Sequence, residues 1–296
     1  MTTPHSIVPM ASTEYGSLKK VIMCMANPFD LDIANLPAEL LDEASLYQAE
    51  HSDMRPYDMA KVHAQQNELI RVLKSNGAEV IQIEPLGSGV LQHYTRDVGF
   101  VVHDQFFIDR PRRDYRKKEL KNLGPITRHL KNVHRIETGC IEGGDVLVDG
   151  DTVIIGQGEE TDIAGINAVI NVLQEKLPNI SVKTLSFTHR GVIHTDTIFN
   201  IVGPGLAILH RPSLIPEDIS WLENRYELID ATEDEARMLA INTLAIGDNK
   251  VVMLAPGGRL ADKLTDHGLT PILIDYSEVT ALPGSFRCTT LPVVRS

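Results

Sequence analysis

Cysteine is scarce in this sequence, which contains three such residues, Cys24, Cys140 and Cys288, in 296 positions. An odd number at wide spacing argues against a disulfide framework and a zinc site, and it is typical of a reducing compartment. No stretch approaches the roughly 18 apolar residues that a membrane span needs, and the first residues lack the pattern of a secretory signal. The sequence therefore predicts a cytoplasmic protein without a membrane partner.

Positive charge is also in short supply. The chain has 28 Lys and Arg against 40 Asp and Glu, which gives a formal net charge of −12. Because nucleic-acid-binding proteins need a basic surface, this balance predicts no nucleic-acid partner, although it permits a small cationic substrate. Apolar residues make up 43% of the chain, which is enough for a substantial core and argues against a mainly disordered protein.

One pattern is present five times along the chain. Its first copy has a polar segment at 95–97, an apolar strand, a turn at 103–105 and a second apolar strand. Tight turns between two apolar runs are typical of β-hairpins. Equivalent polar positions follow one another at steps of 48, 51, 46 and 46 residues, at Asp97, Asp145, Asp196, Asn242 and Cys288. A period near fifty is typical of a propeller or a related ring of repeats.

A helix and one further strand are expected before each hairpin. Apolar periodicity predicts such helix–strand pairs at 57–75 with 78–83, 120–132 with 133–136, 161–177 with 180–185, 216–225 with 226–229, and 260–267 with 270–274. A shorter helical pattern occurs at 38–43. The fifth hairpin lacks one strand, which the free strand at 18–25 can supply, and this pairing would remove an exposed edge.

These patterns together predict the fold class. We expect an α/β protein in which five pseudo-symmetric units form a propeller. The N-terminal strand would close the ring by pairing with the last repeat, and residues 1–296 would form a single catalytic domain.

Side chains that are capable of catalysis occupy equivalent positions in these units. In a ring of repeats the polar segments of all units point toward the central axis, and here they contribute Asp97, Glu142, Asp145, His194, Asp196, Asn242 and Cys288. Each residue alone has an ordinary structural explanation; a single cysteine, for example, is more often a small buried apolar residue. Their coincidence at matching points of the repeats favours one shared site.

Four motifs resemble those of the guanidino-group-modifying superfamily. They are TRD at 95–97, EGGDVL at 142–147, HTD at 194–196 and RCTTLPVVR at 287–295, in this order. The superfamily includes arginine deiminases, dimethylarginine dimethylaminohydrolases and amidinotransferases, and the resemblance implies their five-bladed α/β propeller, the pentein fold. It covers nearly the whole chain, from about residue 15 to residue 295.

The resemblance also implies roles for individual residues. Cys288 would attack the guanidinium carbon and expel an amine, which leaves a covalent amidino-thioether. His194 would protonate the leaving group and then activate water, while Glu142 would pair with the histidine or the guanidinium. Asp97 would hold the guanidinium nitrogens, as a carboxylate must, because a guanidinium offers only donors. Neither a metal nor an organic cofactor is needed for this chemistry.

Further residues bear on the substrate. Asp196 resembles the second carboxylate of deiminases and amidinotransferases, and Asp145 is expected to contact substrate with it. Two carboxylates favour an unmethylated guanidine, because leaving one of them unpaired would cost about 1–3 kcal/mol. Arg116 aligns with an arginine that binds a substrate carboxylate. Relatives commonly have arginine at the position of Glu160. If Glu160 faces the pocket, its negative charge would favour a substrate with an amine at its far end. Otherwise Glu160 is a solvated acid beside a helix N-terminus.

Three classes of function remain at this point. The first is a C–N hydrolase of a small arginine-like guanidino compound, of the deiminase type and acting in one or two rounds, with dimethylarginine dimethylaminohydrolase as the nearest alternative. The second is an amidinotransferase, which passes the amidino group to an amine. The third is a non-catalytic propeller, against which the cysteine, histidine and acids argue. The sequence leaves open whether the chain forms a homodimer.

Overall fold

The strands of the protein form five sheets of three strands each in the computed structural model, which describes residues 6–27, 58–87, 91–189 and 191–296. This arrangement is consistent with the predicted five-fold repeat and confirms the α/β class. The helical pattern at 38–43 lies outside the described residues. In the described part of the chain, no helix combines the length and the apolar character that crossing a membrane requires.

Four of the sheets have the same construction. In the first, β3 (Gly99–Val102) and β4 (Gln105–Ile108) form an antiparallel hairpin, and β5 (Val133–Arg135) pairs parallel to β4. The same order recurs in β6 (Val146–Asp149), β7 (Thr152–Gln157) and β8 (Ser181–Ser186), in β9 (Phe199–Gly203), β10 (Leu206–Leu209) and β11 (Glu227–Asp230), and in β12 (Leu244–Gly247), β13 (Lys250–Leu254) and β14 (Thr270–Ile274).

The fifth sheet is assembled from both ends of the chain. Strand β1 (Leu18–Cys24) pairs antiparallel to β15 (Leu291–Arg295) and parallel to β2 (Glu79–Ile83). The predicted pairing of the N-terminal strand with the last repeat is therefore confirmed. It places the segment that follows Cys288 directly against the first strand of the chain.

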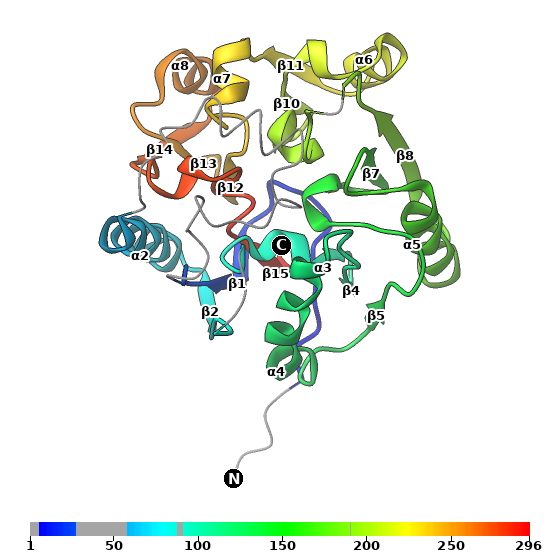
Figure 1. Ribbon diagram of the computed structural model, residues 1–296. Helices are drawn as coiled ribbons and strands as arrows, with labels where there is room; N and C mark the ends of the chain where they lie inside the picture. The colour runs from blue at the N-terminus through cyan, green and yellow to red at the C-terminus, as the bar shows by residue number, and fades with distance from the viewer. Residues whose placement is uncertain (1–5, 28–57, 88–90, 190) are drawn as a thin grey trace.

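Four long helices confirm the predicted helical periodicity to within a few residues. They are α2 (Met59–Ser75), α5 (Ile163–Lys176), α6 (Pro216–Glu223) and α8 (Gly258–Asp266). In Figure 1 these helices lie at the periphery of the molecule, outside the sheets. This position leaves the centre to the turns that precede the hairpins.

The prediction of a single helix at 120–132 is wrong. The segment contains η5 (Glu119–Leu123) and the four-residue helix α4 (Gly124–Thr127) instead. Pro125 lacks the N–H group that a continuous helix would need at this point. A further helix, α7 (Glu233–Arg237), was not predicted, although Thr232 and Glu235 form a capping box that signals its start.

The core of the protein lies between neighbouring sheets. Side chains alternate along β6, so Val146 and Val148 pack toward the first sheet and α5, whereas Leu147 packs toward the third sheet. Each sheet thus contributes one apolar face to each neighbour. This packing fixes the relative positions of the units and therefore of the polar turns between them.

Short 3₁₀ turns precede three of the hairpins and carry the polar motifs. They are η4 (Thr95–Val98), η6 (Gly143–Asp145) and η7 (Thr195–Thr197), which lead into β3, β6 and β9. A Cβ atom on Gly144 would lie 2.6 Å from His194 Nδ1 and 2.9 Å from Asp97 Oδ1. Glycine at this position therefore allows the three turns to approach one another closely.

Candidate active site

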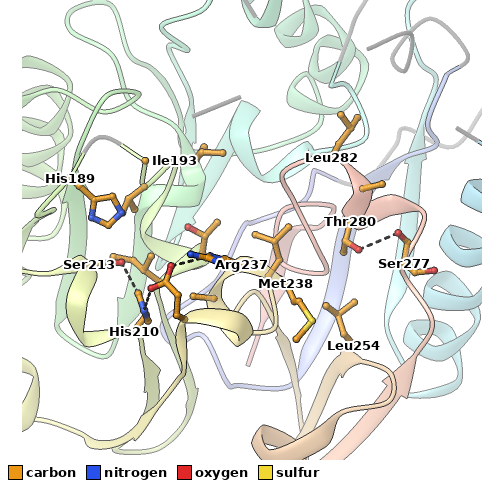
Figure 2. Close-up of a pocket in the computed structure, with 18 of the residues that line it drawn as sticks. His189, Ile193, His210, Ser213, Arg237, Met238, Leu254, Ser277, Thr280 and Leu282 are labelled. Atoms are coloured by element: carbon orange, nitrogen blue, oxygen red, sulfur yellow. Dashed lines mark hydrogen bonds and ion pairs between the residues drawn. The ribbon is translucent and has the colours of Figure 1, made fainter. Parts of the chain in front are cut away.

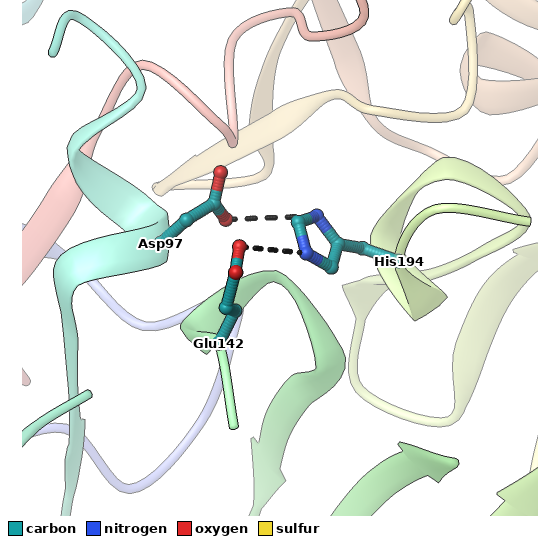
Figure 3. A group of neighbouring side chains, drawn as sticks. All are labelled: Asp97, Glu142 and His194. Atoms are coloured by element: carbon teal, nitrogen blue, oxygen red, sulfur yellow. Dashed lines mark ion pairs between the residues drawn. The ribbon is translucent and has the colours of Figure 1, made fainter. Parts of the chain in front are cut away.

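Three of the predicted site residues meet at the centre of the molecule. Figure 3 shows Asp97 from η4, Glu142 from the residue before η6, and His194 from the residue before η7, with their side chains directed at one another. His194 Nε2 lies 3.2 Å from Glu142 Oε2, and Nδ1 lies 3.6 Å from Asp97 Oδ1. All three residues are buried. The structure thus brings the motifs of three different repeats into one place.

The surroundings of His194 favour its charged form. Burial alone would lower the pKa of the ring, but Asp97, Asp145 and Glu142 outweigh it and raise the pKa of His194 well above its ordinary value. A charged imidazole can donate a proton to a leaving group. The spacing of Asp97, Glu142 and His194 would also suit a metal ion.

Arg116 lies against the same acids. The sequence predicted that this residue would face a substrate carboxylate, but its guanidinium is buried beside three carboxylates of the chain, Asp97, Glu119 and Glu142. Burial alone would lower the pKa of Arg116, but these three acids raise it well above its ordinary value. Arg116 is therefore permanently charged and neutralises part of the acid cluster.

Cys288 lies in the turn that precedes β15 and is 1% exposed. The backbone N–H groups of Ser285, Arg287 and Cys288 donate to Asn242 Oδ1 at 3.1–3.2 Å. Asn242 Nδ2 in turn donates to the backbone oxygen of Asp196 at 3.2 Å. A single amide side chain from the fourth repeat therefore fixes the turn that carries the thiol.

The Cys288 thiol is neutral in the unliganded protein. Burial, followed by the charges of Asp196 and Asp97, raises the pKa of Cys288 well above its ordinary value. The sulfur lies 3.9 Å from both carboxylate oxygens of Asp196. A cation that binds among these acids would offset their charge, so it would favour the thiolate that nucleophilic attack requires.

Asp196 has a buried partner within the chain. Arg287 Nη1 donates to Asp196 Oδ2 at 2.8 Å, and the same guanidinium pairs with Glu14 at 3.2 Å and donates to the Val146 oxygen at 2.6 Å. Asp196 was predicted to bind the substrate directly, and Arg287 would compete with the substrate for this carboxylate. One of its oxygens is held by Arg287, while both lie near the thiol.

Asp145, which the sequence predicted to contact substrate, positions the turn of the next repeat through one of its oxygens. Its Oδ1 accepts from the Thr195 backbone N–H at 2.8 Å and from the Thr195 hydroxyl at 3.1 Å. These bonds fix the turn that begins after His194. Asp109, which no sequence motif indicated, has the equivalent role in the preceding repeat, because its Oδ2 accepts from the Gly143 N–H at 2.7 Å. Its place directly after β4 was the only available signal.

Replacing Asp145 with Asn should change how stability depends on pH. Burial raises the pKa of Asp145 from an ordinary value near 3.8 to about 7. The unfolded chain therefore releases this proton first, and the free energy of unfolding falls as pH rises from about 4 to 7. Asn keeps the acceptor oxygen and has no proton to lose, so the variant should gain up to about 4 kcal/mol relative to the natural chain over this range.

Chemical denaturation at several pH values measures this effect. Asp151→Asn, which changes an exposed acid in the following turn, is the matched control and should leave the profile unchanged. Parallel profiles for the natural chain and Asp145→Asn would show that Asp145 is ionised in the folded protein throughout this range.

Glu160 is turned inward. Its side chain is largely buried, and Arg113 Nη2 lies 2.8 Å from its Oε1. Within the described residues, Oε2 is buried and accepts no hydrogen bond. The next residue, Thr161, accepts from the Glu142 backbone N–H at 3.2 Å, which ties this loop to the centre. Burial and then the charge of Glu142 raise the pKa of Glu160. An acid exposed to solvent would have neither a buried carboxylate nor a pKa raised by burial.

A pocket of about 530 Å³ adjoins the centre. Figure 2 shows His189, His210 and Ser213 on one side and Ser277, Thr280 and Leu282 on the other. Its lining includes Ile193, which precedes His194, and Thr197, which lies three positions after it, but neither Cys288 nor Asp97. The pocket therefore lies beside the buried charges rather than at them.

Comparison with known protein families shows which family the chain belongs to. The family model described as N,N dimethylarginine dimethylhydrolase, eukaryotic, matches residues 43–295. The chain belongs to this family. The assignment confirms the predicted membership of the guanidino-group-modifying superfamily, whose enzymes act on amidine and guanidino groups.

Individual relatives agree with the dimethylarginine dimethylhydrolase family. The chain is 30% identical over 287 residues to the uncharacterized protein YkgA of Bacillus subtilis, covering 96% of this chain and 94% of that protein. It is 23% identical over 240 residues to the N(G),N(G)-dimethylarginine dimethylaminohydrolase of Streptomyces coelicolor, covering 80% and 88%. The solved structure of SxtG, an amidinotransferase from Microseira wollei, matches with a TM-score of 0.81 at 15% identity over 98% of both chains, which shows a common fold.

Proposed function

We propose that this chain hydrolyses a C–N bond of a small guanidino compound through a covalent amidino-thioether on Cys288. The observation that carries the proposal is the close approach of the reactive groups. Cys288 Sγ lies 3.9 Å from Asp196, in the turn that follows His194, and the His194 ring lies 3.2 Å from Glu142 and 3.6 Å from Asp97. The thiol, the imidazole and the carboxylates therefore belong to a single buried site.

The reaction starts from the cationic substrate. Asp97 and Glu142 accept hydrogen bonds from its guanidinium, whose charge favours loss of the Cys288 proton to solvent. The thiolate adds to the guanidinium carbon, and His194 gives its proton to the departing nitrogen as the C–N bond breaks. Ammonia or an amine leaves.

Water completes the reaction. His194, which is now neutral, takes a proton from a water molecule that attacks the thioether carbon. The C–S bond then breaks and regenerates the cysteine. The overall reaction consumes one water and yields a ureido product together with ammonia or an amine. A second round on that product would give an amine, ammonia and carbon dioxide.

Two substrate types have specific support. The second carboxylate, Asp196, favours an unmethylated guanidine and release of ammonia. The family match favours a dimethylated guanidine and release of dimethylamine. Mass spectrometry of protein quenched during incubation with arginine, dimethylarginine, agmatine and guanidino acids, with assays for both amines, separates them. A Cys288 adduct that accumulates with one equivalent of released amine or ammonia and no ureido product would contradict hydrolysis. Consumption of an added acceptor amine would instead identify an amidinotransferase.

The far end of the substrate is expected to carry an amine. The uncompensated oxygen of Glu160 needs a donor, which an ammonium group provides and a carboxylate does not. In Glu160→Gln, the ammonium would lose the negative charge that attracts it. We expect kcat/KM for agmatine to fall about 10- to 100-fold, with a smaller change for arginine. Glu159→Gln is the matched control, and an equal loss for both substrates would contradict this role.

We further infer that the five units close into a ring that forms one catalytic domain. The support is a chain of hydrogen bonds between consecutive polar turns. It runs from Asp109 to Gly143, from Asp145 to Thr195 and from Asn242 to the Cys288 turn. The N–H of Arg96 donates to the Cys288 oxygen at 3.0 Å, which joins the last turn to the first.

A further inference from the structure

Arg116 places a guanidinium group of the chain itself in the site. The residue belongs to the short helix α3 (Asp114–Lys117) and is 4% exposed. Nη1 lies 2.9 Å from Asp97 Oδ2 and 3.4 Å from Glu142 Oε2. Nε and Nη2 donate to Glu119 Oε2 at 3.2 and 3.1 Å. The two carboxylates assigned to the substrate guanidinium thus already hold one.

Arg116 satisfies these carboxylates incompletely. A single nitrogen, Nη1, serves both of them, whereas a guanidinium binds most strongly when two parallel N–H groups meet one carboxylate. The other oxygens, Asp97 Oδ1 and Glu142 Oε1, are buried and accept no hydrogen bond from the described residues. A second guanidinium with a better approach would therefore bind these acids more completely than Arg116 does.

The chain also provides partners that can hold Arg116 after a ligand has displaced it from Asp97 and Glu142. Glu119 is 1% exposed and already receives two of its N–H groups, and the Tyr94 backbone oxygen accepts a third at 3.2 Å. Two guanidinium groups between the same two acids would repel each other. A bound cationic substrate therefore requires Arg116 to give up Asp97, and Glu119 compensates its charge when it does.

We propose that Arg116 is an internal occupant of the guanidinium site and determines specificity, because only a ligand with a comparable set of N–H donors displaces it. The inference rests on the proposed function in one respect, the assignment of Asp97 and Glu142 to the substrate guanidinium. An ammonium group is a compact point charge and does not reproduce the planar fork of a guanidinium. Ligand affinity is reduced by the fraction of molecules in which Arg116 still occupies the site.

Calorimetry with methylguanidine and methylammonium tests the inference in a Cys288→Ser background, which forms no thioether. Arg116→Met is combined with Glu119→Gln so that Glu119 is not left charged without Arg116, while Asp97 and Glu142 keep His194 beside them. In this protein, methylguanidine should bind at least about tenfold more tightly than in the Cys288→Ser protein, and methylammonium should gain by a similar or larger factor, because Arg116 no longer competes with either cation. Equal methylguanidine affinities, or binding to neither protein, would overturn the inference.

Glu119→Gln alone is the matched control. It removes the alternative partner of Arg116 and keeps the occupant, so methylguanidine should bind more weakly. A gain equal to that of the combined variant would show that Arg116 is not the cause. If the combined variant does not fold, a crystal structure of the Cys288→Ser protein with methylguanidine decides. Methylguanidine should lie at Asp97, with Arg116 Nη1 beyond hydrogen-bond distance. An unmoved Arg116 with the ligand elsewhere would refute the inference.

Asp97→Asn separates this inference from the proposed function. Methylguanidine binding that survives this substitution would contradict the assignment of Asp97 to substrate, and with it the proposed function. Binding that depends on Asp97 but is insensitive to Arg116 would contradict the inference alone.

Discussion

Replacing Cys288 with Ser is expected to lower kcat by about 10⁴-fold or more for every guanidino substrate that the natural chain turns over. A serine hydroxyl ionises far less readily than a thiol, and His194, whose pKa the neighbouring acids raise, is protonated and cannot serve as the base that activates it. The melting temperature should change little. The thiol is buried in a turn that is fixed by Asn242 through backbone N–H groups, which the substitution leaves in place.

Product release and thermal unfolding are the two measurements. Cys140→Ser is the matched control, because Cys140 is a partly buried free thiol outside the acid cluster and should be dispensable. Full activity in Cys288→Ser would place the nucleophile elsewhere and remove the basis of the proposed mechanism. A large fall in melting temperature would instead assign Cys288 a structural role.

The repeat, the hairpins and most helices were predictable because their signals are local. A turn such as Asp149–Asp151 between two apolar runs specifies a hairpin whatever surrounds it. The prediction failed where one residue interrupted a periodic segment, as Pro125 does in the segment predicted as a helix at 120–132. Local periodicity describes the average of such a segment, whereas a missing N–H group acts at a single position.

The site was predictable as a set of residues but not as a set of contacts. The sequence located Asp97, Glu142 and His194 at matching points of the repeats, and the structure brings their side chains together. The sequence did not reveal that Asp145 holds the turn of the next repeat or that Arg116 lies among the acids. A carboxylate has the same sequence signal whether its partner is a substrate, a backbone N–H or an arginine. Only the packing of distant units selects the partner.

Arg287 shows most clearly how distant segments determine the site. Its partner Glu14 lies 273 positions away in the chain, so no local pattern connects them. Burial opposes the charge of Glu14, but Arg287, Arg96 and Arg295 together lower the pKa of this acid to about 2. A depressed pKa means that Glu14 contributes stability above pH 4.5, which is lost as the pH falls toward 2.

Arg287→Met is therefore expected to reduce the free energy of unfolding by about 3–5 kcal/mol, since it leaves Asp196 and Glu14 buried without their shared cation. Urea denaturation at neutral pH measures the loss, and acid unfolding should move to higher pH. Arg211→Met is the matched control. Arg211 forms two pairs that are largely exposed to solvent, with Glu223 and Asp230, and its removal should cost at most about 1 kcal/mol.

Adding Glu14→Gln to Arg287→Met should recover part of the loss, because it removes one of the two uncompensated charges. The recovery should be smaller than the original loss, since Asp196 stays unpaired beside the Cys288 thiol. If Arg287→Met costs no more than Arg211→Met, the buried charges must be screened by water, and the raised pKa of the Cys288 thiol would lose its physical basis. The stability of this variant therefore tests the same low-dielectric environment that the proposed catalytic mechanism requires.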